Sequence, residues 1–278
     1  MTRGLPLVVG RGRMGLALAR SLPAPRARSL ALAARSVDGA RLGPGPRTVF
    51  LAVTDRHIEE AAARLAPGLG RGDVAFHLAG MRGPEALAAL KARRCAVAAL
   101  HPLVAISGVD PPGEFTERPT FLVEGDRAAV AEAKRVAKAL GGVCVVATAV
   151  ERAAYHSAAA LVATGATALA QGAAHRLRRS LTPAPSPREE RAMIASLLRS
   201  VARNVEAHGP EGALASPLLR GDTGTVRLHL DTLDAVGAGA LYAAALGVVL
   251  GAAEAVGAVT PETVEAARAL LRERARAL

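Results

Sequence analysis

Residues Leu5 to Gly15 read LPLVVGRGRMG and carry the clearest indication of the fold. A short apolar run ends at Gly10, and the pattern G-x-G-x-x-G follows at once and opens a helical pattern. In this setting Gly10 permits a tight turn, Gly12 lets a pyrophosphate approach the backbone, and Gly15 lets helix and strand pack closely. The phosphates would lie on the N–H groups at the positive end of the helix. The stretch therefore predicts a dinucleotide-binding turn between strand and helix.

The same alternation continues through the first half of the chain. Apolar runs predict further strands at residues 30–34, 48–53, 74–78, 95–100, 120–123 and 143–147, with helical patterns between most of them. Pro84 is placed to open one of these helices and Asp55 to cap another. Continuous apolar strands alternating with helices indicate a parallel sheet covered on both faces. We therefore predict a doubly wound α/β domain over residues 1–148.

The second half has no comparable strand pattern. Helical patterns begin near residue 149, after the Pro-rich residues 182–187, and at 261. Ser186 begins a capping box, Asp222 is placed to cap a helix, and Thr260 stands before a proline at a further helix start. These signals predict an all-α C-terminal domain over residues 149–278.

Composition limits the class of protein. The chain has 278 residues, of which 51% are hydrophobic and 21% charged, so it is globular rather than disordered. Only two cysteines, Cys95 and Cys144, argue against a disulfide framework or a cysteine-based zinc site. We therefore expect no metal, and a reducing, cytoplasmic location. The net charge of +11 attracts anions such as a nucleotide or an acidic metabolite.

The sequence disfavours membrane and nucleic-acid partners. The N-terminus lacks the apolar run of a signal peptide. Residues 157–174 and 235–253 carry no charge, but they are mostly Ala and Gly with polar residues interspersed. We therefore predict buried helices there rather than membrane spans. Aromatic residues make up only 2% of the chain, and its basic clusters are short, so a nucleic-acid binder would lack stacking platforms.

The end of the second predicted strand indicates which dinucleotide is bound. NAD sites usually place a carboxylate there, whereas this sequence has Arg35 and Ser36, which suit the 2′-phosphate of NADP. A solvated surface arginine is the alternative interpretation of Arg35. Later strand ends should face the same crevice. The predicted cofactor-binding residues are Gly10, Arg11, Gly12, Arg13, Met14, Gly15, Arg35, Ser36, Val53, Thr54, Ala79 and Gly80.

Two histidines are candidates for acid–base catalysis, because histidine titrates near neutrality. His101 ends a predicted strand beside the crevice, although it could simply bond the loop before Pro102. His156 follows Tyr155, a candidate substrate-binding residue, on a helix with a polar seam at Ser157, Thr164 and Gln171. The seam is either a substrate wall or a contact between helices.

A second polar group surrounds a predicted helix start in the second half. Arg220 is placed to bind a substrate carboxylate, Asp222 is a candidate for orienting water or histidine, and Thr225 and His229 complete a substrate-binding group. The alternative is a helix cap at 222 and a core histidine at 229.

The order of these motifs resembles a group of Rossmann-like proteins with a helical C-terminal domain of unknown function. The resemblance covers nearly the whole chain and rests on the glycine loop, Ala-Arg-Ser at 34–36, Leu-Ala-Val-Thr-Asp at 51–55, His-Leu-Ala-Gly at 77–80, His-Pro-Leu at 101–103, Tyr-His at 155–156 and Arg-Gly-Asp-x-Gly-Thr-Val-x-x-His from 220. The group is similar to ketopantoate reductase, pyrroline-carboxylate reductase and deazaflavin-dependent NADP oxidoreductases. The resemblance implies a Rossmann-type sheet, an NADP-linked reductase or dehydrogenase, and a homodimer formed through the C-terminal helices.

One departure from those reductases concerns the proton donor. Many of them use a lysine early in the helical domain, whereas no lysine follows Lys138 here. The donor must then be His156, His101, Tyr155 or a water held by Asp222. We predict an NADP(H)-dependent oxidoreductase acting on a small anionic oxo- or imino-acid, with ketopantoate-like reduction as the first example. A non-catalytic NADP(H)-binding sensor is the alternative.

Overall fold

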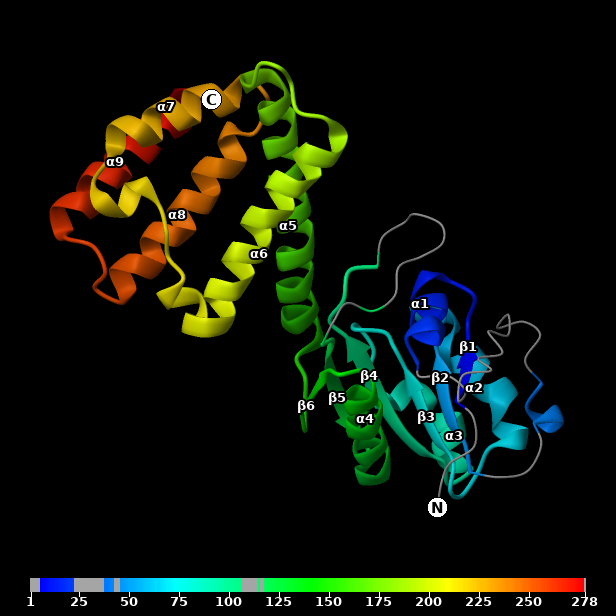
Figure 1. Cartoon of the computed structure of the whole chain (residues 1–278). Helices are drawn as coiled ribbons and strands as arrows, with labels where there is room; N and C mark the ends of the chain where they lie inside the picture. The colour runs from blue at the N-terminus through cyan, green and yellow to red at the C-terminus, as the bar shows by residue number, and fades with distance from the viewer. Residues whose placement is uncertain (1–5, 23–37, 43–45, 107–114, 116–117, 278) are drawn as a thin grey trace. The chain divides into compact units, whose positions relative to one another are not determined.

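The computed structural model describes residues 6–22, 38–42, 46–106, 115 and 118–277. Its contacts divide the chain into two compact units, Met1–Leu161 and Val162–Leu278, which we call the sheet unit and the helical unit. The division falls inside one long helix, α5 (Arg152–Ser180). Figure 1 shows all labelled strands in the first unit and labelled helices α6 to α9 in the second.

The sheet unit contains a six-stranded sheet in the order β1-β2-β3-β4-β5-β6. Five predicted strands besides the first appear in it, and the predicted strand at 30–34 lies outside the described residues. Flanking helices cover both faces, which confirms the α/β class. The strand bounds are β1 (Leu7–Val9), β2 (Thr48–Leu51), β3 (Val74–His77), β4 (Ala96–Pro102), β5 (Thr120–Gly125) and β6 (Val143–Val146).

The prediction of a wholly parallel sheet is wrong at one pair. β4 and β5 are antiparallel, and His101 stands opposite Leu122, whereas the other four pairs are parallel. A parallel pair needs a crossover segment, usually a helix, and the described residues between β4 and β5 form none. The chain therefore turns back beside the strand that it has just left.

Two apolar clusters occupy opposite faces of the sheet, because side chains alternate along each strand. One cluster joins alternate strand residues to α2 (Ile58–Leu65) and α3 (Ala88–Ala92). The other joins the remaining strand residues to α1 (Arg13–Ser21) and α4 (Arg127–Ala139). Phe50 and Phe76 stack in the second cluster with ring centroids 5.3 Å apart.

Short 3₁₀ turns connect these elements and revise one predicted cap. They are η2 (Gly39–Arg41), η3 (Asp55–His57), η4 (Ala66–Gly68) and η5 (Pro84–Leu87). Pro84 opens η5 as predicted. Asp55 lies inside η3 and does not cap α2, because the 3₁₀ turn moves the N-cap position of α2 to His57.

The described part of the helical unit contains the rest of α5 and five further helical elements. They are α6 (Pro187–Gly212), η6 (Pro217–Arg220), α7 (Thr223–Asp234), α8 (Gly239–Ala255) and α9 (Pro261–Ala277). All three predicted caps are confirmed: Ser186 forms the full capping box with Glu189, Asp222 accepts from the backbone N–H of Thr225, and Thr260 accepts from that of Thr263.

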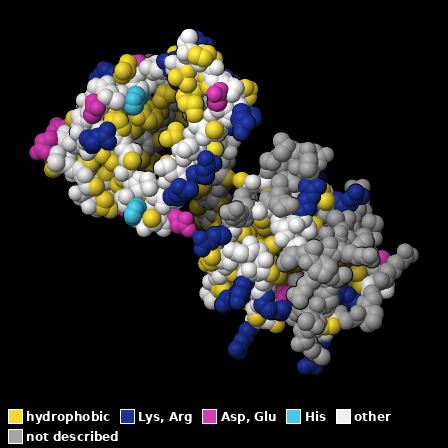
Figure 2. Space-filling view, viewed as in Figure 1, with side chains coloured by type: hydrophobic (Ala, Val, Ile, Leu, Met, Phe, Trp, Pro, Cys, Tyr) yellow, Lys and Arg dark blue, Asp and Glu magenta, His cyan; other side chains and the backbone are white. Residues whose placement is uncertain are grey.

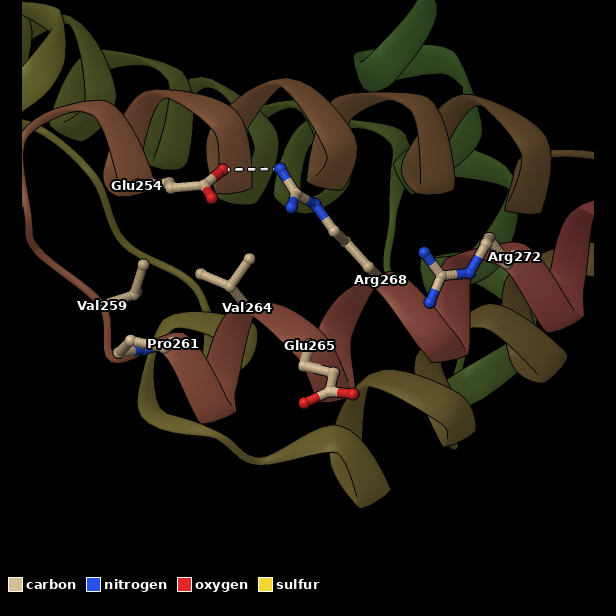
Figure 3. Close-up of a pocket in the computed structure, with 7 residues that line it drawn as sticks. All are labelled: Glu254, Val259, Pro261, Val264, Glu265, Arg268 and Arg272. Carbon is tan, nitrogen blue, oxygen red and sulfur yellow. Dashed lines mark hydrogen bonds and ion pairs between the residues drawn. The ribbon is translucent and has the colours of Figure 1, made fainter.

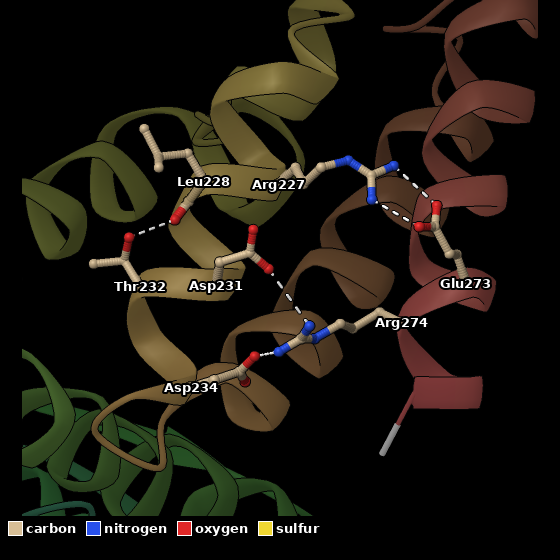
Figure 4. A network of polar contacts seen from close by, with 7 residues as sticks. All are labelled: Arg227, Leu228, Asp231, Thr232, Asp234, Glu273 and Arg274. Carbon is tan, nitrogen blue, oxygen red and sulfur yellow. Dashed lines mark hydrogen bonds and ion pairs between the residues drawn. The ribbon is translucent and has the colours of Figure 1, made fainter.

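Among its described residues, the helical unit has one apolar cluster, formed between η6, α7, α8 and α9. Polar side chains along α7 contact the C-terminal part of α9, as Figure 4 shows. Arg227 makes two hydrogen bonds to Glu273 at 2.8 and 2.9 Å, and Arg274 contacts both Asp231 and Asp234.

The prediction that the helices at 157–174 and 235–253 are buried is wrong, because most of their residues are not buried. Residues 157–174 lie in α5 and residues 239–253 in α8, whereas 235–238 form the turn before α8. Ala174 is the only buried residue of α5, and α8 buries four residues. A helix packed along one side leaves its other side uncovered, and Figure 2 shows apolar side chains on the visible face of this unit. Among the described residues, no helix is long and apolar enough to cross a membrane.

Candidate functional site

The glycine loop lies at the end of β1, where strand and helix approach each other closely. Gly10 has a φ of +128°, and a Cβ there would overlap the carbonyl oxygen of Ala52, the residue after β2. A Cβ on Gly15 would overlap the carbonyl oxygen of Gly10. These two glycines are therefore required by the fold itself.

Gly12 differs from its neighbours, because nothing lies within 4 Å of the position that its Cβ would take. It is the N-cap of α1, and no side chain caps the helix or places an acidic group in its first turn. Arg11 and Arg13 beside it are exposed. The loop thus presents uncapped N–H groups, open space and positive charge together, which suits an anionic ligand.

The other predicted cofactor residues divide into two sets. Met14, Val53 and Ala79 are partly buried and pack against the two sheet clusters. Thr54 is exposed at the end of β2, and its hydroxyl lies 2.8 Å from Nδ1 of His57. Arg35 and Ser36 lie outside the described residues, so the predicted NADP preference stays a prediction.

A cluster of rings lies where β3 and β4 end, within the sheet unit. Nδ1 of His101 is 2.7 Å from the hydroxyl of Tyr155, and the two rings meet edge to face with centroids 5.5 Å apart. The ring of His156 is 5.6 Å from that of His101. Gly80 lies against both histidines, since a Cβ there would be 2.5 Å from Nδ1 of His156 and 2.9 Å from Nε2 of His101.

His77 anchors the loop beside this cluster. Its ring is fully buried, and Nε2 donates to the carbonyl oxygen of Gly83 at 2.9 Å, which leaves Nδ1 as an acceptor. Nδ1 has no hydrogen-bond partner among the described residues. Burial lowers the pKa of His77, so the imidazole is neutral at neutral pH.

The structure makes His101 a weaker base than the sequence suggests. Burial, followed by the nearby His156 and Arg152, lowers the pKa of His101 to about 4. The lowered pKa departs from the expectation that His101 titrates near neutrality. The sequence shows that His101 ends a strand, but it does not show how far the side chain is buried. Tyr155 is also affected: burial raises the pKa of its phenol, while the Arg152 guanidinium acts in the opposite direction.

Arg152 is a residue of this cluster that sequence reasoning missed. It is paired with Glu124 on β5, and it acts on both His101 and Tyr155. The signal was present, because Arg152 precedes Tyr155 by three residues, a spacing that places both on one face of a helix.

The structure places the second predicted group in the helical unit, around the start of α7. Asp222 caps that helix, which lowers the pKa of its carboxyl, and Arg220 and His229 contribute to the same direction. Nδ1 of His229 lies 3.2 Å from the hydroxyl of Tyr242. The helix-cap interpretation is thus correct for Asp222, while the substrate-binding role of the group stays a prediction.

Two cavities in the helical unit were not expected. Figure 3 shows one of about 460 Å³ between α8 and α9, where Arg268 is paired with Glu254 at 2.7 Å. None of the predicted site residues lines it. The other, of about 500 Å³, includes Gln171 of the polar seam together with His175 and Arg178. The guanidinium of Arg178 is already bound to Glu190.

Comparisons with known proteins bear on the fold. A family model described as a domain of unknown function, DUF2520, matches residues 119–246. A comparison with curated protein sequences finds no match. A solved structure from Thermotoga maritima is 24% identical, with a TM-score of 0.59 over 90% of this chain and 99% of its own.

Two further solved structures carry functional names. A Bacteroides fragilis protein assigned as an NADP oxidoreductase is 20% identical, with a TM-score of 0.52 over 83% of this chain and 91% of its own. Pyrroline carboxylate reductase from Plasmodium falciparum, solved with NADP bound, is 11% identical, with a TM-score of 0.55 over 97% of this chain and 98% of its own. The chain has the Rossmann-type fold of these proteins. The predicted resemblance is confirmed at the level of the fold.

Proposed function

We propose that the protein is an NADP(H)-dependent oxidoreductase that acts on a small anionic oxo- or imino-acid. The observation that carries this proposal is the glycine loop. Protein atoms occupy the space that a Cβ would take at Gly10 and Gly15, whereas the corresponding space at Gly12 is open. The uncapped start of α1 and the exposed Arg11 and Arg13 favour a pyrophosphate at that position.

The residues present fit a nicotinamide dinucleotide. Gly12 and the first N–H groups of α1 would hold the pyrophosphate, and Arg35 with Ser36 would bind the 2′-phosphate. When bound, the nicotinamide would supply or accept a hydride. The names of two structures with the same fold, one of them solved with NADP, support this choice of cofactor.

The protein's own side chains would handle the proton and the substrate carboxylate. His101, Tyr155 and His156 supply ring nitrogens and a hydroxyl beside Gly80, at the edge where the parallel strands end. Arg220 is proposed to bind the carboxylate, assisted by Thr225 and His229, with Asp222 orienting water. The low cysteine content, two residues in 278, suits a cytoplasmic enzyme.

Thermal unfolding with NADPH, NADH or no ligand tests the proposal. A ligand at 100 times its dissociation constant adds about 2.7 kcal/mol of stability, which raises Tm by about 5–10 °C. Gly12→Ala is expected to keep the ligand-free Tm, because its Cβ meets nothing, but to lose the rise with NADPH. Gly165→Ala on α5 is the matched control, since its Cβ also has open space. No rise for the wild-type chain contradicts the proposal, and equal rises with NADPH and NADH contradict the role of Arg35.

The sensor alternative makes a different prediction about turnover. A sensor would bind NADPH but would not oxidise it in the presence of ketopantoate, other oxo-acids or cyclic imino-acids. Measuring NADPH absorbance with this panel separates the two functions. We favour the enzyme because titratable side chains from β4 and α5 meet beside Gly80, which cofactor binding alone does not require.

We also propose that two copies of the chain associate through their helical units. On α6, large apolar side chains recur at every fourth position and are 38–66% exposed; this α6 stripe consists of Met193, Leu197, Val201 and Val205. An apolar stripe that meets its own copy across a two-fold axis is self-complementary. Light scattering should give twice the chain mass of 28.3 kDa, and a monomeric mass at micromolar concentration contradicts the proposal.

A further inference from the structure

The hydrogen bond between His101 and Tyr155 joins two elements that are far apart in the sequence. His101 is on β4 and Tyr155 is in the first turn of α5, and both lie in the sheet unit. Their separation of 2.7 Å is a short distance for a bond between a hydroxyl and a ring nitrogen. Both side chains are half-buried, so the pair is partly shielded from water but still reachable.

The surroundings of His101 keep its ring neutral. The charged and titratable groups that face it are His156 and Arg152 on α5, His77 on β3 and Asp55 on η3. Burial and the three basic groups outweigh the single carboxylate. A neutral imidazole carries one N–H and one lone pair, so it can accept a proton on one nitrogen while it releases a proton from the other.

The second nitrogen of His101 points toward the strand ends. Nε2 lies against Gly80, and no described residue is hydrogen-bonded to it. Nδ1 of His156 approaches the same glycine, is buried, and has no partner among the described residues. Gly80 is a predicted cofactor-binding position, so the Tyr155–His101 pair borders the place where the proposed reaction would occur.

The chain contains a second pair of the same residue types that lacks these surroundings. His229 on α7 and Tyr242 on α8 are 3.2 Å apart, with ring centroids 5.9 Å apart. Tyr242 packs against the apolar cluster of the helical unit. Burial raises the pKa of both phenols, but an arginine opposes the rise only at Tyr155. Of the two phenols, only Tyr155 therefore has both a histidine at hydrogen-bond distance and an arginine that acts on its pKa.

We propose that Tyr155 is the catalytic proton donor of the reaction inferred above, and that His101 positions its hydroxyl and returns its proton. The proposal rests on the proposed function. The Oη–H bond of Tyr155 breaks, and the proton joins the substrate oxygen or nitrogen that becomes a hydroxyl or amine. Nδ1–H of His101 then gives its proton to the phenolate, and Nε2 takes one proton from the solvent. The imidazole exchanges tautomers without becoming a cation, and the net change is one proton from solvent to substrate.

Phenol absorbance tests this arrangement without a cofactor. The chain has two tyrosines and no tryptophan, so phenolate absorbance near 295 nm reports Tyr155 alone in a Tyr242→Phe background. Stopped-flow pH jumps read the phenol before the protein unfolds in alkali. If Nδ1–H of His101 donates to the phenolate, His101→Leu removes a charge-assisted hydrogen bond and raises the pKa of Tyr155 by about one to two pKa units. His101→Asn places an amide N–H near the position of Nδ1 and should restore the pKa. An unchanged or lower pKa in His101→Leu overturns the proposal.

Turnover provides the second readout. With NADPH and ketopantoate, Tyr155→Phe should lower the rate at least 100-fold, the usual contribution of a positioned proton donor, while Tyr242→Phe retains it. A rate for Tyr155→Phe within threefold of wild type overturns the proposal. The rise in Tm with NADPH, measured on the same variants, tests the proposed function separately. If the wild-type chain shows no rise, the proposed cofactor binding is wrong. If Tyr155→Phe shows the same rise as the wild-type chain, the substitution has changed only the proton step.

Discussion

The central strands of the sheet unit and helix α6 of the helical unit differ in how far they bury their large apolar side chains. In the sheet unit Phe50, Phe76 and Phe121 are at most 1% exposed, whereas on α6 Leu197 and Val201 are 66% and 58% exposed. A sheet with helices on both faces encloses two apolar layers within one chain. A helix packed along one side leaves a second side that a single chain does not cover. The sheet unit therefore encloses the core of its central strands, and the helical unit presents the α6 stripe for a further contact.

Removing a ring from the sheet core should produce the largest effect. Phe76→Ala deletes a fully buried side chain that stacks on Phe50, and cavity formation should cost about 3–5 kcal/mol of unfolding free energy. Urea denaturation measures this loss. Leu197→Ala on α6, which removes an exposed side chain, is the comparison and should cost far less in the isolated chain. Equal losses would show that the two units do not differ in burial.

A charge on the α6 stripe should weaken association by a slightly smaller amount. Val201→Glu would bury an unpaired carboxylate in the proposed interface, a cost of about 3 kcal/mol, or more than 100-fold in the dimer dissociation constant. Analytical ultracentrifugation measures this constant. Leu181→Glu, which is also exposed but lies beyond α5, should leave it unchanged. Dimers of normal affinity in Val201→Glu would show that another surface makes the contact.

Lowering the pH should destabilise the sheet unit through its neutral histidines. Folding lowers the pKa of His101 from 6.5 to about 4 and also lowers that of His77, so the unfolded chain binds more protons in this range. The contribution of these neutral histidines to the free energy of unfolding is fully present above pH 6.5 and is lost as the pH falls toward 4. The loss due to His101 should be about 2 kcal/mol. Urea denaturation at pH 7 and pH 4.5 should show a smaller difference for His101→Asn than for wild type. The same difference in both proteins would assign the effect to other groups.

The smallest expected effect concerns the capping box of α6. Ser186→Ala removes the hydroxyl that accepts from the N–H of Glu189 and should cost about 1 kcal/mol. Thermal unfolding followed by circular dichroism measures it, and Ser180→Ala in the last turn of α5 is the matched control. Ser186→Thr, which retains an acceptor oxygen, should recover most of the loss. If alanine and threonine behave alike, the box does not stabilise this helix.

Features that depend on neighbouring residues could be predicted from the sequence. The glycine turn before α1, the capping box at Ser186, the cap at Asp222 and the helix start at Pro261 were all predicted correctly. Each is set by hydrogen bonds or backbone angles within a few residues. The cap predicted at Asp55 failed, because a 3₁₀ turn displaced the start of the helix.

The candidate site shows where such prediction ends. Tyr155, His156 and His101 were recognised one at a time, but their meeting beside Gly80 depends on contacts across more than 50 residues of chain. Arg152 lowers the pKa of His101 and of Tyr155 only because the fold brings these three residues together.

Local pattern and composition are enough to predict the strands that form the sheet, the glycine turn, the helix starts and the abundance of positive charge. Long-range contacts set the antiparallel placement of β5, the exposure of α5 and α6, the space at Gly12 and the neutral state of His101. The physical reason is that burial, open space and pKa are properties of surroundings, and residues distant in the chain supply those surroundings.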